Sequence, residues 1–216
     1  DFELLASYGT AFNAPTFNEL FFPNFGSADN KPEKSRSFEV GLRSTGEFGS
    51  WAVYGFQTDV EDLIAFDSDT SLANNIDSAR MRGVEVEGGT AWQAWDIDAT
   101  ATWLNARNRG NGSNRGNHLI RRPTWSGNLN VSRDIEAYRV SSTVHYAGVA
   151  FDNASNARKL DKYTTVDLRV SRAVRKDWRV EVSANNLFDE NYQTASFFNQ
   201  DGRNFFLRLR YAPKVD

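Results

Sequence analysis

Residues 95–105 read Trp95-Asp96-Ile97-Asp98-Ala99-Thr100-Ala101-Thr102-Trp103-Leu104-Asn105, and apolar and polar side chains alternate over most of this stretch. Successive side chains of a β-strand point to opposite faces, so a period of two predicts a strand with one apolar and one polar face. The stretch also has the length of a tilted strand that crosses a membrane, roughly 9–11 residues.

The same period recurs along the whole chain, and helical spacing is almost absent. We therefore predict an all-β fold. Its ten strands are expected at residues 1–8, 36–43, 51–60, 80–90, 95–105, 123–132, 137–147, 161–172, 178–186 and 203–212.

The two faces of these predicted strands differ in charge. In strand 51–60 we assign Ala52, Tyr54, Phe56 and Val60 to the apolar face and Asp59 to the charged face. The other strands supply further apolar residues, such as Leu4, Val84 and Leu207, and further charged ones, such as Glu3, Arg43 and Arg208. An unpaired buried charge costs several kcal/mol, so the charged face must meet water and the other face must meet something apolar. A soluble β-sandwich would give the same pattern.

The connections between the strands separate these two possibilities. Long connections are predicted at 9–35, 61–79, 106–122, 148–160 and 187–202, and they alternate with short ones at 44–50, 91–94, 133–136 and 173–177. Outer-membrane barrels have short periplasmic turns and long outer loops. The pattern therefore predicts a transmembrane antiparallel up-and-down β-barrel. Trp51, Trp92, Trp95 and Trp178 flank the short turns, where an aromatic girdle is expected.

The composition excludes several other classes. The chain has 216 residues and a net charge of −3, so nucleic acid is not expected as a partner. It has no cysteine, which excludes disulfides and thiolate metal sites. No apolar run approaches the roughly 20 residues of a membrane helix. No signal peptide opens the chain, and we expect a fragment or a mature start.

Several segments resemble TonB-dependent receptors of the outer membrane. The resemblance rests on the segments 6–20 (Ala-Ser-Tyr-Gly-Thr-Ala-Phe-Asn-Ala-Pro-Thr-Phe-Asn-Glu-Leu), 30–35 (Asn-Lys-Pro-Glu-Lys-Ser), 83–85 (Gly-Val-Glu) and 185–192 (Asn-Asn-Leu-Phe-Asp-Glu-Asn-Tyr). These segments span the chain in the family's order and spacing.

This resemblance implies that residues 1–216 are the C-terminal part of the receptor barrel, the last ten of 22 strands. The plug domain and the N-terminal segment that contacts TonB have no counterpart here. The implied location is the bacterial outer membrane, with lipid as a partner and TonB acting through the missing segment. The implied activity is uptake of a large scarce nutrient. Residues 119–123 (Leu-Ile-Arg-Arg-Pro), together with the opening strand and the 185–192 motif, most resemble the cobalamin-transporter branch and so favour cobalamin, with a ferric siderophore as the alternative.

Enzymatic activity is not expected. The chain has two histidines, His118 and His145, and no hydroxyl nucleophile is spaced to pair with either. The alternative is a self-contained ten-strand barrel enzyme, protease-like, which would need a carboxylate facing His145. Pairing between strands 1–8 and 203–212 would favour that alternative.

Aromatic and basic residues of the long loops are the candidates for ligand binding, because exposed aromatic clusters often mark binding surfaces. The candidates are Phe21, Phe22, Phe25, Arg121, Phe197 and Phe198. Packing between the loops is the alternative role for the phenylalanines, and Arg121 and Arg122 could instead pair with carboxylates of the wall. We expect no cofactor and no metal. Asp67-Ser68-Asp69 has oxygen ligands suited to Ca²⁺ but lacks a complete loop pattern, so we interpret it as a solvated loop.

Overall fold

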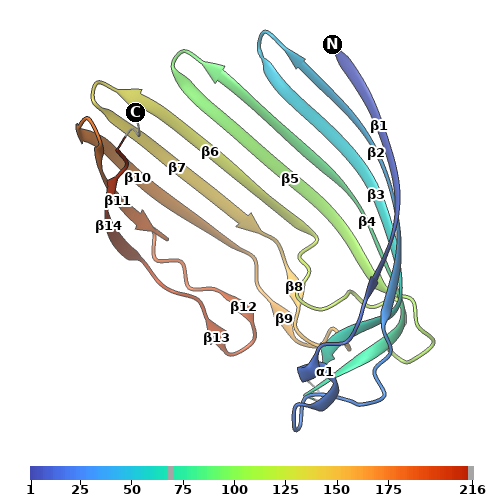
Figure 1. Cartoon of the computed structure of the whole chain (residues 1–216). Coiled ribbons are helices and arrows are strands. Elements are labelled where there is room, and N and C mark those ends of the chain that lie inside the picture. Colours follow the sequence, from blue (N-terminus) through green and yellow to red (C-terminus); the bar gives the residue numbers. More distant parts are fainter. Residues whose placement is uncertain (68–70, 214–216) are drawn as a thin grey trace.

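The computed structural model describes residues 1–67 and 71–213, and its main element is one antiparallel sheet of ten strands (Figure 1). Each strand pairs with its neighbour in chain order. The ten strands are β1 (Phe2–Asn13), β2 (Glu33–Gly46), β3 (Gly49–Asp67), β4 (Leu72–Trp92), β5 (Trp95–Asn108), β6 (Trp125–Ile135), β7 (Tyr138–Ala147), β10 (Tyr163–Arg175), β11 (Trp178–Asn185) and β14 (Asn204–Tyr211). All ten predicted strands are thus confirmed.

The connections add small elements that the sequence did not predict. These are a short helix, α1 (Phe17–Phe21), and two ribbons formed by β8 (Ala150–Phe151) with β9 (Lys159–Leu160) and by β12 (Gln193–Ala195) with β13 (Phe198–Asn199). The prediction of a long connection at 61–79 is wrong for most of this range, because β3 and β4 continue through it as a paired ribbon. No helix among the described residues is long and apolar enough to cross a membrane.

The short turns gather at one end of the sheet and the long connections at the other (Figure 1). We call these the turn end and the loop end. At the turn end, Gln93 and Ala94 both have positive φ, 47° and 71°. Two such residues in a row match the twist that a two-residue hairpin needs. The parity of the connections predicted from the sequence is therefore confirmed.

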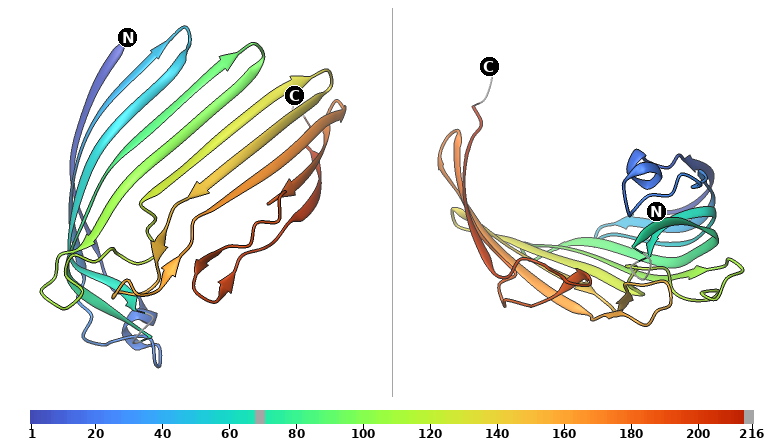
Figure 2. Two further views of the ribbon diagram at one scale, coloured as in Figure 1. Left: turned by 180° about the vertical axis from the view of Figure 1, so that it is seen from behind. Right: turned by 90° about the horizontal axis from the view of Figure 1, so that it is seen from below.

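The sheet curves into an open trough (Figure 2). Within the described residues β1 pairs only with β2, and β14 pairs only with β11. The ten strands do not close on themselves, contrary to the alternative of a self-contained barrel.

Cross-strand register sorts the side chains into two faces, because residues directly opposite each other share a face. One row joins Leu4, Leu42, Val53, Val86 and Ala101 across five strands. We call the face that carries this row the apolar face. The adjacent row joins Glu3, Arg43, Ala52 and Glu87 and defines the polar face.

The predicted faces are correct for every strand but one. In β3, Tyr54 and Phe56 lie on the polar face, where Tyr54 is opposite Gly41 and Phe56 is opposite Glu39. A Cβ on Gly41 would collide with the Tyr54 ring, so the glycine makes room for the aromatic side chain.

Ala52 and Val60 lie on the polar face as well, and Asp59 lies on the apolar face with Arg80 opposite it. Period two could not fix the phase of β3, because both of its alternations are apolar near Trp51.

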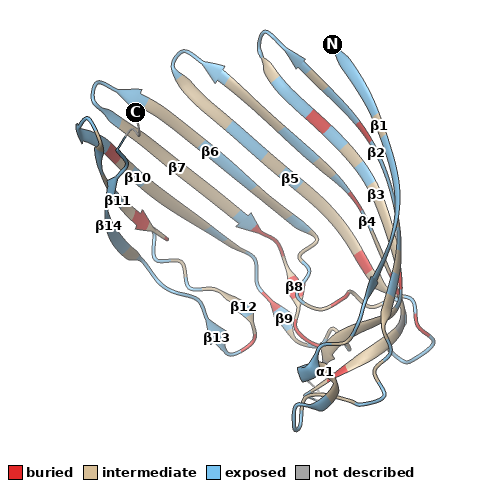
Figure 3. Cartoon of the chain, in the orientation of Figure 1, coloured by how far each residue is buried: buried red, intermediate tan, exposed pale blue. Residues whose placement is uncertain are grey.

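Few residues are buried (Figure 3). The exposed ones include large apolar side chains. The one cluster of buried apolar residues in the described part of the chain lies at the loop end, where Val60, Ala79 and Ala106 pack under Leu119. The polar face is therefore partly covered by the connection after β5.

The tryptophans near the short turns lie on the apolar face. Trp51 and Trp92 are exposed there, and Trp178 packs against Tyr211 with ring centroids 4.8 Å apart. Phe2 adds an edge contact to the Trp51 ring. This arrangement is typical of an aromatic belt at a membrane interface.

Candidate functional site

The long connections meet at the loop end through backbone hydrogen bonds. Ala73 N donates to Phe25 O at 2.7 Å, which ties the connection after β1 to the β3–β4 ribbon. Arg121 N donates to Phe151 O at 2.7 Å, and His118 N donates to Asn156 Oδ1 at 2.7 Å. Together these contacts make the loop end one packed layer.

A continuous chain of side-chain contacts runs through this layer and joins the β3–β4 ribbon to the connections after β1, β5, β7 and β11. The Phe25 ring stacks on Phe66 at a centroid distance of 5.7 Å. The Arg121 guanidinium lies 5.6 Å from the Phe66 centroid and 2.6 Å from Asp152 Oδ1.

Arg158 continues the chain. Its guanidinium lies 4.0 Å from Asp152 Oδ2 and 5.5 Å from the Phe197 centroid. We call the six residues Phe25, Phe66, Arg121, Asp152, Arg158 and Phe197 the rim chain.

Asp152 is the electrostatic centre of the rim chain. Its side chain is 2% exposed, whereas the side chains of Arg121 and Arg158 are each 37% exposed. A buried carboxylate is costly unless it is paired and hydrogen-bonded. The two arginines therefore fix Asp152 as a charged anchor between the connections.

Two members of the rim chain have backbone conformations that are unusual for their residue types. Arg121 has φ 54° and Phe197 has φ 70°. A bulky residue in the left-handed region is uncommon and is held there only by its surroundings. Such strain is concentrated at ligand clamps and switch regions.

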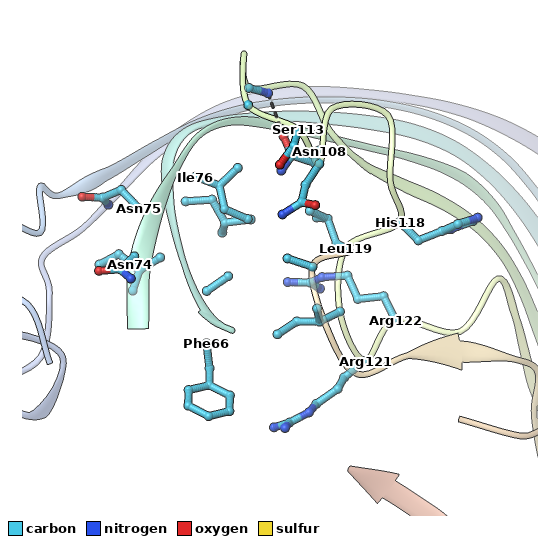
Figure 4. A pocket seen from close by; sticks show the side chains of 18 residues that line it. Phe66, Asn74, Asn75, Ile76, Asn108, Ser113, His118, Leu119, Arg121 and Arg122 are labelled. Atoms are coloured by element: carbon cyan, nitrogen blue, oxygen red, sulfur yellow. Dashed lines mark hydrogen bonds between the residues drawn. The ribbon is translucent and has the colours of Figure 1, made fainter. Parts of the chain in front are cut away.

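A hollow of about 670 Å³ opens beside the rim chain, between the β3–β4 ribbon and the connection after β5 (Figure 4). Its lining combines aliphatic side chains, such as Ile76 and Leu119, with amides, such as Asn74 and Asn75. Arg122 also lines it, and none of its described lining residues is acidic. Pockets of this size with a few convergent polar groups suit small-molecule ligands.

His118 lies at the edge of the hollow with its ring 5.4 Å from the Phe151 ring. Burial lowers the pKa of His118, and the positive charge of Arg107 lowers it further. The imidazole therefore adds a neutral polar group to the site at neutral pH.

Short local motifs hold the aromatic residues in place. At α1, Thr16 Oγ1 accepts from Glu19 N and Thr16 N donates to Glu19 Oε2 at 2.7 Å, which is a capping box. This cap fixes the helix that carries Phe17 and Phe21, whose rings lie 5.1 Å apart.

Asn186 organises the connection after β11. Its backbone N donates to Asp167 Oδ1 at 2.8 Å, and its side chain exchanges hydrogen bonds with Glu190. Asp189 Oδ1 accepts from Arg203 N at 2.7 Å, which closes the connection. The residues of the 185–192 motif thus hold the base of the connection that carries Phe197.

The structure brings together three of the six predicted site residues, Phe25, Arg121 and Phe197, in the rim chain. Phe22 reaches the chain through an edge contact with Phe25 at 6.3 Å. Phe21 packs on Phe17 instead, and Phe198 is exposed in β13. Arg121 pairs with a carboxylate of a neighbouring connection, and not with the wall.

Sequence reasoning missed Phe66, Asp152 and Arg158. The sequence indicated that Arg121 could pair with a carboxylate, but it could not identify that carboxylate, because Asp152 lies 31 residues away. The segment Asp67-Ser68-Asp69, weighed above as a Ca²⁺ site, overlaps residues 68–70, which lie outside the described residues. His145 Nδ1 donates a hydrogen bond to Asn128 Oδ1 at 2.8 Å, and no carboxylate is paired with His145 in the described structure.

Comparison with known proteins assigns this architecture to a protein family. The model of the family described as "TonB dependent receptor-like, beta-barrel" matches residues 1–187. The chain belongs to the TonB-dependent receptor family. Members of this family are β-barrels of the bacterial outer membrane, so the apolar face of this TonB-dependent receptor wall contacts lipid and the polar face lines the interior.

Two curated relatives carry the name "Vitamin B12 transporter BtuB". The one from Photobacterium profundum is 32% identical over 98% of this chain, and the one from Vibrio vulnificus is 30% identical over 97%. The chain spans 35% of the length of each relative.

Solved structures share the fold of this TonB-dependent receptor wall. "Copper transporter OprC" matches 98% of the chain and 36% of its own length with a TM-score of 0.81 at 21% identity. The siderophore receptor PiuA from Acinetobacter baumannii matches 97% of the chain and 34% of its own length with a TM-score of 0.78 at 18% identity.

Proposed function

We propose that this wall belongs to a receptor that binds cobalamin at the loop end and imports it with energy supplied through TonB. In this proposal the loop end faces the cell exterior. Residues 1–216 supply the last ten strands of a 22-strand barrel that is plugged by a separate N-terminal domain. The transport cycle needs that plug and the segment that contacts TonB.

The hollow beside the rim chain is the observation that carries the proposal. Cobalamin presents amide groups around a largely apolar macrocycle, together with one phosphodiester. A lining of aliphatic and amide side chains suits the first part, and the Arg122 guanidinium suits the phosphodiester because it can bind two oxygens at once. The names of the two curated relatives support the same ligand.

A ferric siderophore is the competing ligand. Many ferric siderophores are anionic and would favour a strongly basic lining, whereas the hollow has two arginines, and Arg121 is already paired with Asp152. The balance of amide and aliphatic groups therefore favours cobalamin over an anionic iron chelate.

Binding to the full-length receptor in detergent distinguishes the two ligands. We expect calorimetry to detect binding of cyanocobalamin and no binding of ferric desferrioxamine or ferric enterobactin. Arg122→Gln should weaken cyanocobalamin binding about 10-fold, the equivalent of one charge-assisted hydrogen bond. Arg82→Gln, on the apolar face, is the matched control and should leave the affinity unchanged. Binding of an iron chelate with no response to cyanocobalamin would overturn the proposal.

The dependence on TonB is tested by uptake. Cells that express the full-length receptor should accumulate radiolabelled cyanocobalamin only when TonB is present. Equal accumulation in a strain that lacks TonB would contradict active transport.

A further inference from the structure

The apolar face changes its chemistry near the loop end. Along β2 its side chains read Leu42, Val40, Phe38, Arg36 and Lys34 toward the loop end, and along β4 the same face reads Val86, Val84, Arg82 and Arg80. Both strands thus switch from apolar to basic residues while the alternation continues unbroken. The basic side chains therefore point to the lipid side and not into the barrel.

Register joins these residues into a band across neighbouring strands. Arg36 lies opposite Asp59, Asp59 opposite Arg80, and Arg80 opposite Arg107. We call the five residues Lys34, Arg36, Arg80, Arg82 and Arg107 the basic band.

The basic band carries more positive charge than its own acidic neighbours neutralise. Arg80 Nε lies 2.6 Å from Asp59 Oδ1, and Arg36 Nη2 lies 3.4 Å from Glu61 Oε1. These are the two carboxylates in register with the band, against five basic residues. Arg107 donates to neutral oxygens of Asn105 and Gly116. The excess positive charge faces the surroundings of the barrel.

A hollow of about 560 Å³ lies on this part of the face. Its lining combines Phe12 with three basic residues, Lys34, Arg36 and Arg80, and with the two carboxylates that pair with the arginines, Asp59 and Glu61. Exposed apolar residues, Tyr8 and Phe38, lie in the next row toward the turn end. An apolar surface therefore continues directly into the basic band and its hollow, which matches a molecule that has acyl chains below an anionic headgroup.

We propose that the basic band binds the phosphate groups of a phosphorylated lipid headgroup in the outer leaflet of the outer membrane. The inference rests on the proposed orientation of the loop end, but not on the identity of the transported ligand. Lysine and arginine at a membrane surface attract anionic headgroups, and arginine binds phosphate oxygens in pairs. A free phosphate ion would gain nothing from the adjoining apolar rows, whereas a lipid anchors its acyl chains there.

The test uses the full-length receptor in nanodiscs of phosphatidylcholine with and without diphosphoryl lipid A. Retention of lipid A is measured by native mass spectrometry, and its affinity by titration. The variant Lys34→Gln/Arg82→Gln removes two charges of the basic band and leaves the Arg36–Glu61 and Arg80–Asp59 pairs intact. Arg179→Gln/Arg210→Gln removes two charges from the polar face and is the matched control.

Loss of two surface charges should weaken lipid A binding about 30-fold in the basic-band variant. The control should bind lipid A as the wild type does, and about 10 mM inorganic phosphate should not displace the lipid. Equal affinity in all three proteins would overturn the proposal, as would an equal loss in the control. Displacement by inorganic phosphate would also overturn it, because it would indicate a site for free anions.

The affinity of the basic-band variant for cyanocobalamin should stay unchanged. A failure of the lipid proposal is therefore distinct from a failure of the proposed transport function.

Discussion

Arg121 Nε lies 2.6 Å from Asp152 Oδ1, and this ion pair joins two connections whose residues are 31 positions apart. Asp152 is almost completely buried, and Arg121 also covers the Phe66 ring. The pair is therefore the point where electrostatic and aromatic contacts of the loop end meet. Its removal should loosen the loop end without disturbing the strands.

Asp152→Asn should lower the free energy of local opening of residues 148–160 by about 2–3 kcal/mol, because Arg121 and Arg158 lose their shared anion. Hydrogen exchange of the full-length receptor in detergent measures this change. Asp161→Asn is the control: its carboxylate is 87% exposed and pairs with Lys159 at 3.2 Å, so its effect should stay below about 0.5 kcal/mol. Equal effects of the two substitutions would show that burial of Asp152 does not matter.

Gly41→Ala should destabilise the wall by about 1–3 kcal/mol, because the new methyl group would collide with the Tyr54 ring on the polar face. Urea unfolding of the receptor in lipid vesicles measures the loss. Gly55→Ala is the control, since a Cβ there meets nothing within 4 Å, and it should change stability by less than about 0.5 kcal/mol. Gly41→Ala combined with Tyr54→Ser should recover part of the loss. No recovery would mean that Tyr54 is not the obstacle.

Tyr54 also marks the limit of what the sequence could predict. Alternation identified ten strands and the correct faces of nine, because charged residues such as Glu3 and Arg208 cannot face the hydrocarbon of the membrane without a large cost. In β3 the apolar residues Val53 and Tyr54 fit either face, and only pairing with β2 decides between them. A search for glycines opposite aromatic residues, such as Gly41 opposite Tyr54, would have supplied the missing signal.

The loop end was predictable only in part. Arg121 and the phenylalanines stood out by residue type, but no periodicity links connections that lie far apart in the chain. Asp152 meets both Arg121 and Arg158 because β8 and β9 fold the connection after β7 back toward the connection after β5. Such contacts depend on tertiary structure, which single-residue patterns do not encode.

His118 should make the loop end less stable in acid. Its pKa is lowered in the folded protein by burial and by Arg107, whereas the unfolded segment takes up a proton at about pH 6.5. As the pH falls below that value, the unfolded form binds more protons than the folded one, so the free energy of opening decreases until the folded imidazole is itself protonated.

Hydrogen exchange of residues 109–122 between about pH 8 and pH 5, corrected for intrinsic exchange rates, measures this effect. Opening should be independent of pH above about pH 7.5 and should become easier toward about pH 5. His118→Gln keeps a polar side chain and should abolish the slope. A slope that persists in this variant would assign the effect to another group.

Asn186 offers a test that separates backbone strain from hydrogen bonding. Asn186 is 5% exposed and its backbone φ is 48°. Its side chain forms hydrogen bonds with the backbone of Glu190 and Asp201. Asn186→Gly removes the side-chain bonds but tolerates positive φ, and should cost about 2 kcal/mol.

Asn186→Ala removes the same bonds and adds a Cβ in the left-handed region, so it should cost about 1 kcal/mol more than the glycine variant. Both values come from urea unfolding of the full-length receptor in vesicles. If alanine were as stable as glycine, strain at Asn186 would be absent and its hydrogen bonds alone would hold the connection after β11. If both variants matched the wild type, the motif at 185–192 would have no part in positioning Phe197.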